Sequence, residues 1–470
     1  MSDAFGQILI EKVINVKKET IKRAAAVALA AMMAGTALAG CGESSSNATS
    51  DSPSSKTDSS AADPLADVDG SKGKVYWLNF KPEIDETLQT LAKDYTAKTG
   101  VEVKVVTAAS GSYFDTLTAE MTKPDAPTLF VIGNQQGVKD WKDYALDLKG
   151  TAIEAELNTD AYNLYDESGK LVSMGYCYEC YGIIVNPDLI EQAGHKMDEI
   201  KNFEGLKAVA EDIHARAGEL GFDAFSSSDM DDSSSWRFTG HMANLEYFYE
   251  EKEAGATWTE CPASLTGNYM DNYKNLFDLC INNSLTDPKD LAAGGHNAEN
   301  EFKEGKAAFF VNGSWEYAAV SETVPNATMI PYYCGVEGEE KAGLNCGTEN
   351  CWAVNAKASA EDQKATIDFM VWLVSDPDAN KAMVEQLGIM PYKNAVASTN
   401  GFLNDAAKYT ADGCYVMDWA TNYQPNVDEY RKVLVSALNA YCADQSDANW
   451  AAVKTAFVDG WAVQYAAING

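Results

Sequence analysis

Residues 176–194 of the chain read Tyr-Cys-Tyr-Glu-Cys-Tyr-Gly-Ile-Ile-Val-Asn-Pro-Asp-Leu-Ile-Glu-Gln-Ala-Gly. Residues 181–185 are mostly aromatic and β-branched, which predicts a strand. Pro187 suits the first turn of a helix, acidic residues follow near its positive end, and Gly194 is placed to end it. Glu179 stands just before the strand, among three tyrosines. We therefore expect a strand that leads into a helix, with an acidic side chain at its start.

The residues before this stretch predict alternating strands and helices. Strands are expected at 75–78, 101–105 and 128–132, and apolar residues at helical spacing predict a helix between Pro82 and Gly100. Strands separated by helices argue for a parallel sheet with helices on both faces. Ligands of such sheets bind beyond the carboxyl ends of the strands, which here are residues 79–80, 108–111 and 133–136.

Three motifs resemble one known family. Glu179 with residues 181–184 and 186–189 resembles the first inter-lobe crossing of the extracellular sugar-binding proteins of ABC importers, the family 1 solute-binding type. Residues 312–315 resemble a cleft loop of that family, and residues 347–355 resemble its return crossing. The resemblance implies an α/β, two-lobed, periplasmic-binding-protein-like type II fold. Each lobe is expected to be a mostly parallel sheet flanked by helices, with a ligand cleft between the lobes.

The resemblance also divides the chain into lobes. Within the second lobe we expect a helix over 236–251, a strand over 302–311 and helices from residue 402 onward. The first α/β lobe is expected to comprise residues 74–182 and 343–390, and the second residues 183–342 and 391–470.

The N-terminal residues carry an export signal. Four basic residues between 17 and 23 precede an apolar run over 24–39, which is short for a membrane span. Leu-Ala-Gly-Cys at 38–41 resembles a bacterial lipobox, in which Cys41 receives lipid and becomes the mature N-terminus. A buried N-terminal helix is the alternative, but it explains neither the lipobox nor the polar residues that follow. We expect residues 1–41 to be the signal peptide, residues 42–73 a disordered tether, and the protein to lie at the outer face of a bacterial cell membrane.

The composition limits the partners. The chain has 470 residues, of which 46% are hydrophobic, and this allows two or three domain-sized units with sizeable cores. Seventy Asp and Glu outnumber 36 Lys and Arg, so the net charge is −34. Nucleic acid and anionic lipid headgroups are bound through cationic contacts, and we therefore expect neither as a ligand.

The ten cysteines leave nine once Cys41 is set aside. Nine thiols cannot all pair within one chain, so an intermolecular disulfide or at least one free thiol is expected. Cys177 and Cys180 form a Cys-x-x-Cys motif, but no second such motif follows, and small buried thiols fit better than a redox or zinc site. The pairings left open by the sequence are Cys261 with Cys280, Cys346 with Cys351, and Cys414 with Cys442.

A cleft that recognises sugars needs flat aromatic rings and planar polar groups. Trp315 is the expected stacking residue, with core packing as the alternative. Glu179 can accept two hydroxyl hydrogen bonds or can form a salt bridge instead. Arg237, beside Trp236, can clamp vicinal hydroxyls or a carboxylate, or can pair with an acidic residue of the preceding loop. Further candidates, whose presence turn chemistry or loop packing would also explain, are Asn79, Asn134, Gln135, Glu349, Trp419 and Tyr423.

No catalytic constellation is recognisable in the sequence. The four histidines lack metal-ligand spacing, and no nucleophile elbow or phosphate-binding glycine loop is present. We therefore expect no enzymatic activity, no cofactor and no metal. The chain is interpreted as a monomeric, lipid-anchored substrate-binding component of an ABC transporter, which captures a sugar or oligosaccharide by hinge closure and delivers it to the permease. A cell-surface glycosidase or lyase and an adhesive lipoprotein remain as alternatives.

Overall fold

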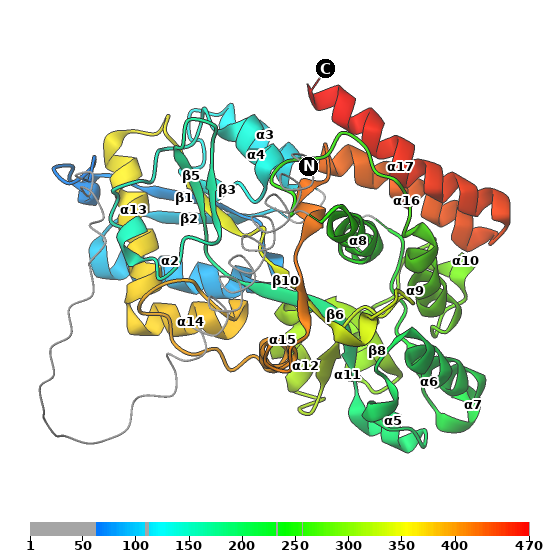
Figure 1. The fold of residues 1–470 in the computed structure, drawn as a ribbon. Coiled ribbons are helices and arrows are strands. Elements are labelled where there is room, and N and C mark those ends of the chain that lie inside the picture. Colours follow the sequence, from blue (N-terminus) through cyan, green and yellow to red (C-terminus); the bar gives the residue numbers. More distant parts are fainter. Residues whose placement is uncertain (1–62, 109–111, 232–233, 256, 470) are drawn as a thin grey trace, which may run out of the picture.

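The computed structural model describes residues 63–108, 112–231, 234–255 and 257–469. These residues form two lobes, each built on one β-sheet with helices around it (Figure 1). The predicted signal segment, its lipidation site Cys41 and tether residues 42–62 lie outside the described residues. Within the described ranges, no helix is both long and apolar enough to cross a membrane.

The sheet of the first lobe has six strands. They are β1 (Val75–Asn79), β2 (Val103–Thr107), β3 (Leu129–Val131), β4 (Asn163–Tyr165), β5 (Leu171–Gly175) and β11 (Cys351–Val354). Their spatial order is β2-β1-β3-β11-β5-β4. Every residue of β1 is buried, as expected for a strand that helices cover on both faces. The three strands predicted from the sequence correspond to β1, β2 and β3.

The described residues of the first lobe form five main helices, α2 (Asp85–Thr99), α3 (Tyr113–Met121), α4 (Gln135–Trp141), α13 (Ala360–Ser375) and α14 (Pro377–Leu387). Side-chain caps begin three of them, α4, α13 and α14. Pro82 opens a 3-10 turn ahead of α2, and Gly100 ends α2 with a φ of +80°. The side chain of Asn134 accepts a hydrogen bond from the Gly137 backbone N–H and caps α4. Apolar side chains from the sheet and these helices pack into one core.

The sheet of the second lobe also has six strands. They are β6 (Glu179–Val185), β7 (Asp223–Phe225), β8 (Ala307–Gly313), β9 (Thr328–Ile330), β10 (Ala342–Gly347) and β12 (Tyr415–Met417). Five of them lie in the order β12-β10-β6-β8-β7, and β9 pairs with β6. The strand expected over 302–311 begins later, because Asn297 caps a short helix, α11 (Ala298–Lys303), ahead of it.

Helices surround the second sheet on both faces (Figure 1). The helix expected over 236–251 begins as a π-helix, η5 (Arg237–Met242), and continues as α8 (Asn244–Ala254). The other helices are α5 (Pro187–Gln192), η4 (Met197–Glu199), α6 (Phe203–Ala215), α7 (Ala217–Leu220), α9 (Met270–Asn282), α10 (Pro288–Leu291), α11 (Ala298–Lys303), η6 (Ser314–Glu316), α12 (Tyr317–Ser321), η7 (Glu339–Lys341), α15 (Gly401–Ala411), η8 (Ala420–Tyr423), α16 (Val427–Ala443) and α17 (Asp447–Asn469).

The expectation of mostly parallel sheets is wrong for both lobes. In the first sheet β1 runs parallel to β2 and β3, but β11 runs antiparallel to β3 and β5. In the second sheet β6 runs antiparallel to β8, β9 and β10. The reason is that the chain leaves the first sheet from β5 to β6 and returns from β10 to β11, so outgoing and returning strands lie side by side in opposite directions. Each lobe therefore has a mixed sheet.

The chain crosses between the sheets at residues 176–178 and again at residues 348–350. Both crossings lie a few residues from the boundaries expected after residues 182 and 342. A third connection leads from Tyr392, which packs in the core of the first lobe, to α15, which packs on the second. These three connections are the covalent links between the lobes.

Residues 63–73, expected as the end of the tether, pack against the first lobe instead. Leu65 is buried in the core of that lobe. The side chain of Asp69 caps a 3-10 turn over Gly70–Lys72, which lies against α13. The folded part thus begins earlier than its polar composition indicates, because a few apolar and capping side chains are enough to hold this short segment.

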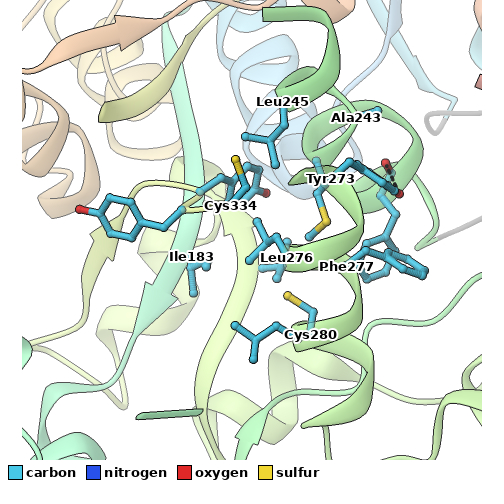
Figure 2. Packing of buried hydrophobic residues seen from close by; sticks show 14 of the residues in the cluster. Ile183, Ala243, Leu245, Tyr273, Leu276, Phe277, Cys280 and Cys334 are labelled. Carbon is cyan, nitrogen blue, oxygen red and sulfur yellow. Dashed lines mark hydrogen bonds between the residues drawn. The ribbon is translucent and has the colours of Figure 1, made fainter. Parts of the chain in front are cut away.

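Alternate residues of β6 serve two different cores, as the two-residue period of a strand requires. Ile183 and Val185 belong to a buried cluster that includes residues of α6, α8, α9, α16 and α17, whereas Ile184 belongs to another that includes residues of α11, α12 and α15. Figure 2 shows part of the first of these clusters, where Leu276 and Cys280 of α9 lie close to Ile183. The central strand of the second lobe is therefore buried on both faces, which fixes the position of Glu179 at its start.

Candidate ligand-binding site

A cleft of about 620 Å³ is lined by residues of both lobes. The first lobe contributes residues 80–83, which follow the carboxyl end of β1, and Ser112, which precedes α3. The second lobe contributes residues between 235 and 241, Trp315 of η6, and one side of α16. The crossings add Glu179, Glu349 and Asn350. The size is that of a site for a small organic ligand, and its position between two lobes is a common one for such sites.

Three indoles and one imidazole form what we call the aromatic wall: Trp236, His241, Trp315 and Trp419. The ring centroid of Trp315 lies 5.9 Å from that of Trp236 and 5.2 Å from that of His241. Trp315 also lies directly over Gly313, where any Cβ would come within 2.1 Å of the indole, so its ring can take this position only because residue 313 is glycine. The wall presents flat apolar faces of the kind on which other rings stack.

His241 is an uncharged member of the aromatic wall. Its ring stacks on Tyr181, with centroids 4.1 Å apart and an interplanar angle of 9°. Burial lowers the pKa of His241 well below its ordinary value, and the positive charge of Arg431 lowers it further. Its Nδ1 atom is buried without a hydrogen-bond partner among the described residues. The π-helix η5 carries this residue, and π-helical turns are frequent at functional sites.

Four polar residues form what we call the charged floor: Lys81, Glu83, Glu179 and Asn350. The Nζ atom of Lys81 lies 2.6 Å from Oε1 of Glu179 and 2.9 Å from Oε1 of Glu83. The side-chain amide of Asn350 donates to Oε2 of Glu179 at 2.7 Å. Both carboxylate oxygens of Glu179 thus have protein partners, and the salt bridge considered from the sequence is present.

The ion pair of the charged floor is almost fully buried, with Lys81 5% and Glu179 3% exposed. Burial raises the pKa of Glu179, and the charge of Lys81 opposes that rise. Burial also lowers the pKa of Lys81, but the charges of Glu179 and Glu83 outweigh this effect and hold it well above its ordinary value. The floor meets the aromatic wall at Trp315, whose ring centroid lies 5.8 Å from the Lys81 Nζ.

One side of α16 carries charged residues into the cleft. Asp428, Arg431 and Lys432 line it from the second lobe. Burial raises the pKa of Asp428, and the charge of Arg431 opposes the rise. Asp428 and Arg431 also line a smaller cavity of about 30 Å³, to which Glu349 contributes. This helix therefore faces the return crossing from the other side of the cleft.

Some predicted residues lie elsewhere. Asn79 is fully buried, and its amide donates to the Lys81 carbonyl at 2.7 Å, so it supports the charged floor from behind. Asn134 caps α4 and reaches only the smaller cavity. Gln135 begins α4, and Tyr423 ends η8; neither lines the cleft.

Arg237 is the clearest difference from expectation. It is 8% exposed, and its Nε donates to the Val311 carbonyl at 3.1 Å. Its guanidinium lies 4.3 Å from the ring centroid of Trp236. The side chain therefore ties η5 to β8 instead of facing the cleft, because the backbone carbonyls of Val311 and Ser234 accept its N–H groups.

The structure does bring Glu179, Trp236, Trp315, Glu349 and Trp419 together at the cleft. Sequence reasoning missed Lys81, His241, Asn350, Asp428 and Arg431, which also line it. Lys81 carried a usable signal, since it follows the carboxyl end of a predicted strand. Arg431 carried none beyond the scarcity of arginine in the chain.

The nine described cysteines form neither a disulfide nor part of a metal site. Cys177 and Cys180 are buried free thiols, as predicted, and burial raises the pKa of each well above its ordinary value. The pairings that the sequence left open are not formed, because the nine described cysteines are all free. Over the described ranges, no group of His, Cys, Asp and Glu is arranged to hold a metal ion.

Comparison with solved structures supports the two-lobed fold. The solute-binding protein RafE in complex with raffinose is 18% identical, covering 83% of this chain and 99% of its own, with a TM-score of 0.63. The Listeria monocytogenes ABC substrate-binding protein Lmo0181 in complex with cycloalternan is 16% identical, covering 83% and 98%, with a TM-score of 0.63. The GacH receptor of Streptomyces glaucescens, studied unliganded and with acarbose, is 20% identical, covering 84% and 98%, with a TM-score of 0.58.

A family comparison identifies the chain more directly. The model of the bacterial extracellular solute-binding protein family matches residues 90–424, which include both crossings and most of the residues that line the cleft. The chain therefore belongs to the bacterial extracellular solute-binding proteins, a family that acts outside the cytoplasm.

Proposed function

We propose that this protein captures a sugar or oligosaccharide in its cleft as the substrate-binding component of an ABC transporter. The observation that carries the proposal is the aromatic wall, three indoles beside charged and amide groups in a cleft between two lobes. Flat aromatic faces complement the apolar faces of sugar rings, and polar side chains order the hydroxyls. The raffinose, cycloalternan and acarbose of the similar structures agree with a saccharide ligand.

Capture proceeds by closure of the two lobes about their crossings at 176–178 and 348–350. Trp315 and Arg431 approach the ligand from the second lobe, and Lys81 and Glu83 from the first. A ligand that touches both lobes binds the closed arrangement more tightly than the open one and shifts the equilibrium toward closure.

The residues have different roles in this proposal. Trp315 stacks on a sugar ring, and Trp236 and Trp419 extend the surface along the chain of sugars. Glu349 accepts hydrogen bonds from hydroxyls at the return crossing. Glu179 acts through the charged floor, because its two oxygens orient Lys81 and Asn350.

The proposed function is tested by thermal shift and calorimetry with a panel of mono- and oligosaccharides, followed by chromatography of the recovered ligand. We expect micromolar or tighter binding of at least one saccharide, recovered intact. Cleavage of the saccharide would support the glycosidase or lyase alternative, and the absence of any shift across the panel would support the adhesive one.

We propose further that the protein is a monomer anchored through lipid on Cys41 to the outer face of the cell membrane, where it meets the permease. Two acyl chains hold a protein durably on a bilayer. Cys41→Ala is expected to abolish incorporation of labelled palmitate, whereas Cys414→Ala, at a partly exposed thiol of the folded part, leaves incorporation unchanged. A Cys41→Ala protein that stays membrane-bound with the same mature N-terminus contradicts the lipobox.

A further inference from the structure

Arg431 is fixed in the cleft by a buried glutamine. Its Nε donates to Oε1 of Gln424 at 2.8 Å. Gln424 is fully buried, and its amide donates to the Thr239 carbonyl at 2.8 Å and to the Tyr247 hydroxyl at 3.1 Å. Hydrogen bonds from the amide nitrogen to Thr239 and Tyr247 fix the orientation of the Gln424 side chain. Its amide oxygen in turn fixes the orientation of the Arg431 side chain.

Gly240 of the π-helix makes room for the guanidinium. A Cβ at this position would come within 2.9 Å of Nη2 and 3.0 Å of Cζ of Arg431. The guanidinium occupies this position against the helix because residue 240 carries no side chain, and a Cβ there would displace it. Gln424 and Gly240 together preorganise Arg431, which lowers the entropy that ligand binding must overcome.

The Nη groups of Arg431 are open to a ligand. Among the described residues, none makes a hydrogen bond or ion pair with Nη1 or Nη2 of Arg431, although Arg431 lines the cleft. The other described arginines differ, since Arg216 is paired with Asp212, and Arg237 donates to backbone carbonyls of its own lobe. Arg431 therefore presents the N–H donors of Nη1 and Nη2 to the cleft, while the bond from its Nε to Gln424 holds the guanidinium in place.

The charges around Arg431 favour a neutral ligand. The cations that line the cleft are Lys81, Arg431 and Lys432, and the carboxylates are Glu83, Glu179, Glu349 and Asp428. Lys81 is already paired with two of these carboxylates. An anionic ligand would therefore meet a small excess of negative charge in a partly desolvated site, which opposes its binding.

We propose that Arg431 is the specificity-determining residue of the cleft and selects neutral saccharides that present two adjacent hydroxyls to its Nη groups. The inference rests on the proposed function and names the ligand class within it. A planar guanidinium matches two neighbouring oxygen acceptors, whereas a methylene in place of one of them leaves a donor unpaired in the closed cleft. Sites built in this way reject analogues that lack the hydroxyl.

The test compares wild type with Arg431→Met by calorimetry. The probes are raffinose, galactose and a chitin trisaccharide, followed by each monodeoxy analogue of the tightest of these and by its uronic acid form. Wild type is expected to bind the parent sugar at least tenfold more tightly than one monodeoxy analogue and than the uronic acid. Arg431→Met should bind the parent at least tenfold more weakly than wild type and bind parent and analogue within twofold of each other.

Two further variants distinguish the effect of the planar guanidinium of Arg431 from the effect of its positive charge. Arg431→Lys keeps the charge without the fork and should also lose discrimination between parent and analogue. Gly240→Ala keeps the arginine but displaces the end of its flexible side chain, and it should weaken binding of the parent several-fold while melting near the wild-type temperature. Arg216→Met, which removes a paired arginine on α6, serves as the matched control and should bind like wild type.

The outcomes distinguish the two proposals. A wild-type protein that binds no probe overturns the proposed function and this inference with it. A wild type that binds a saccharide, beside a folded Arg431→Met or Arg431→Lys that binds it within twofold and still discriminates against the deoxy analogue, overturns the inference alone.

Discussion

The aromatic wall and the charged floor line the same cleft, but their polar groups are satisfied in different ways. On the floor, Lys81, Glu179 and Asn350 bond to one another at 2.6 and 2.7 Å. On the wall the rings meet by packing, and the buried Nδ1 of His241 has no partner among the described residues. A satisfied buried network resists rearrangement, whereas the open faces of aromatic rings that line a cleft are available to a ligand. The floor thus holds the shape of the cleft, and the wall provides its stacking surface.

The largest effect is expected from removing Lys81, the cation of the charged floor. Lys81→Met leaves Glu179 buried without its counter-charge, and breaking such a pair costs about 3–5 kcal/mol. We expect the free energy of unfolding, measured with urea, to fall by this amount. Lys98→Met is the matched control, since Lys98 pairs with Asp376 at 3.0 Å on the surface, where an ion pair contributes about 0–1 kcal/mol.

A double variant shows whether the stability lost in Lys81→Met comes from the unpaired charge of Glu179 or from lost packing of the Lys81 side chain. Lys81→Met with Glu179→Gln removes both charges, so most of the lost stability should return. If Lys81→Met alone is no less stable than Lys98→Met, the floor is not the rigid element that we describe.

Glu246, a buried carboxylate outside the cleft, can be compared with Glu179 of the floor, because Glu246 lacks, within the described part of the chain, the paired cation that Glu179 has. Burial and the neighbouring carboxylate of Glu250 together raise the pKa of Glu246 to about 9, against the opposing effects of the Tyr269 backbone and Lys454. The ordinary value is 4.5, so between these values the unfolded chain releases a proton that the folded chain keeps. Stability from this group is therefore complete below pH 4.5 and is lost as the pH rises toward 9, by about 1.4 kcal/mol per pH unit.

Glu246→Gln removes this dependence. Relative to wild type, the variant should gain about 2–3 kcal/mol of unfolding free energy between pH 5 and pH 7, measured by urea titration at both values. Glu253→Gln, on the exposed part of the same helix, is the control and should follow wild type at each pH. A constant difference between Glu246→Gln and wild type across this range would mean that Glu246 is ionised in the folded protein.

Glu179→Gln tests whether the floor acts on the ligand directly. The amide keeps an acceptor for Asn350 but loses the charge-assisted bond to Lys81, which is worth about 1.5–3 kcal/mol. Lys81 keeps Glu83 as a partner, so we expect ligand affinity to fall by less than this amount and by less than in a variant of Trp315. An affinity loss greater than that of Trp315→Ala would place Glu179 in direct contact with the ligand.

The smallest effect is expected from reagents aimed at thiols and metals. After denaturation without reductant, thiol reagent should titrate the free cysteines, and a chelator should leave the melting temperature unchanged. A folded monomer with no titratable thiol, or one that loses stoichiometric zinc with its stability, would contradict the description of these residues.

Local patterns predicted the elements well where one segment determines its own structure. The run 181–185 is β-branched and aromatic and forms β6, and Gly100 ends α2 at a positive φ. Strand direction could not be read in this way. Antiparallel pairing of β6 with β10 depends on segments that are far apart in the chain, and no local pattern records it.

The site was predictable for residues that a motif or a strand end identifies, such as Trp315 and Glu179. It was not predictable for side chains whose direction depends on helix geometry. Arg237 and Arg431 both lie in helical segments, yet the Val311 carbonyl of β8 accepts from Arg237, while Gln424 and the bare backbone of Gly240 hold Arg431 in the cleft. These contacts between distant residues decide which arginine meets the ligand.

If the aromatic wall binds the ligand while the fold rests on other residues, removing the Trp315 indole should weaken binding and leave the fold intact. Calorimetric titration of Trp315→Ala with the best saccharide of the panel should show binding weaker by about 2–4 kcal/mol, the scale of a buried aromatic anchor. Trp372→Ala, which removes a similarly half-buried indole from α13 of the first lobe, should bind normally. Ligand-free unfolding of Trp315→Ala should stay close to wild type, because its ring lines an open cleft. Normal saccharide binding by Trp315→Ala, or unfolding of the ligand-free variant, would contradict the account.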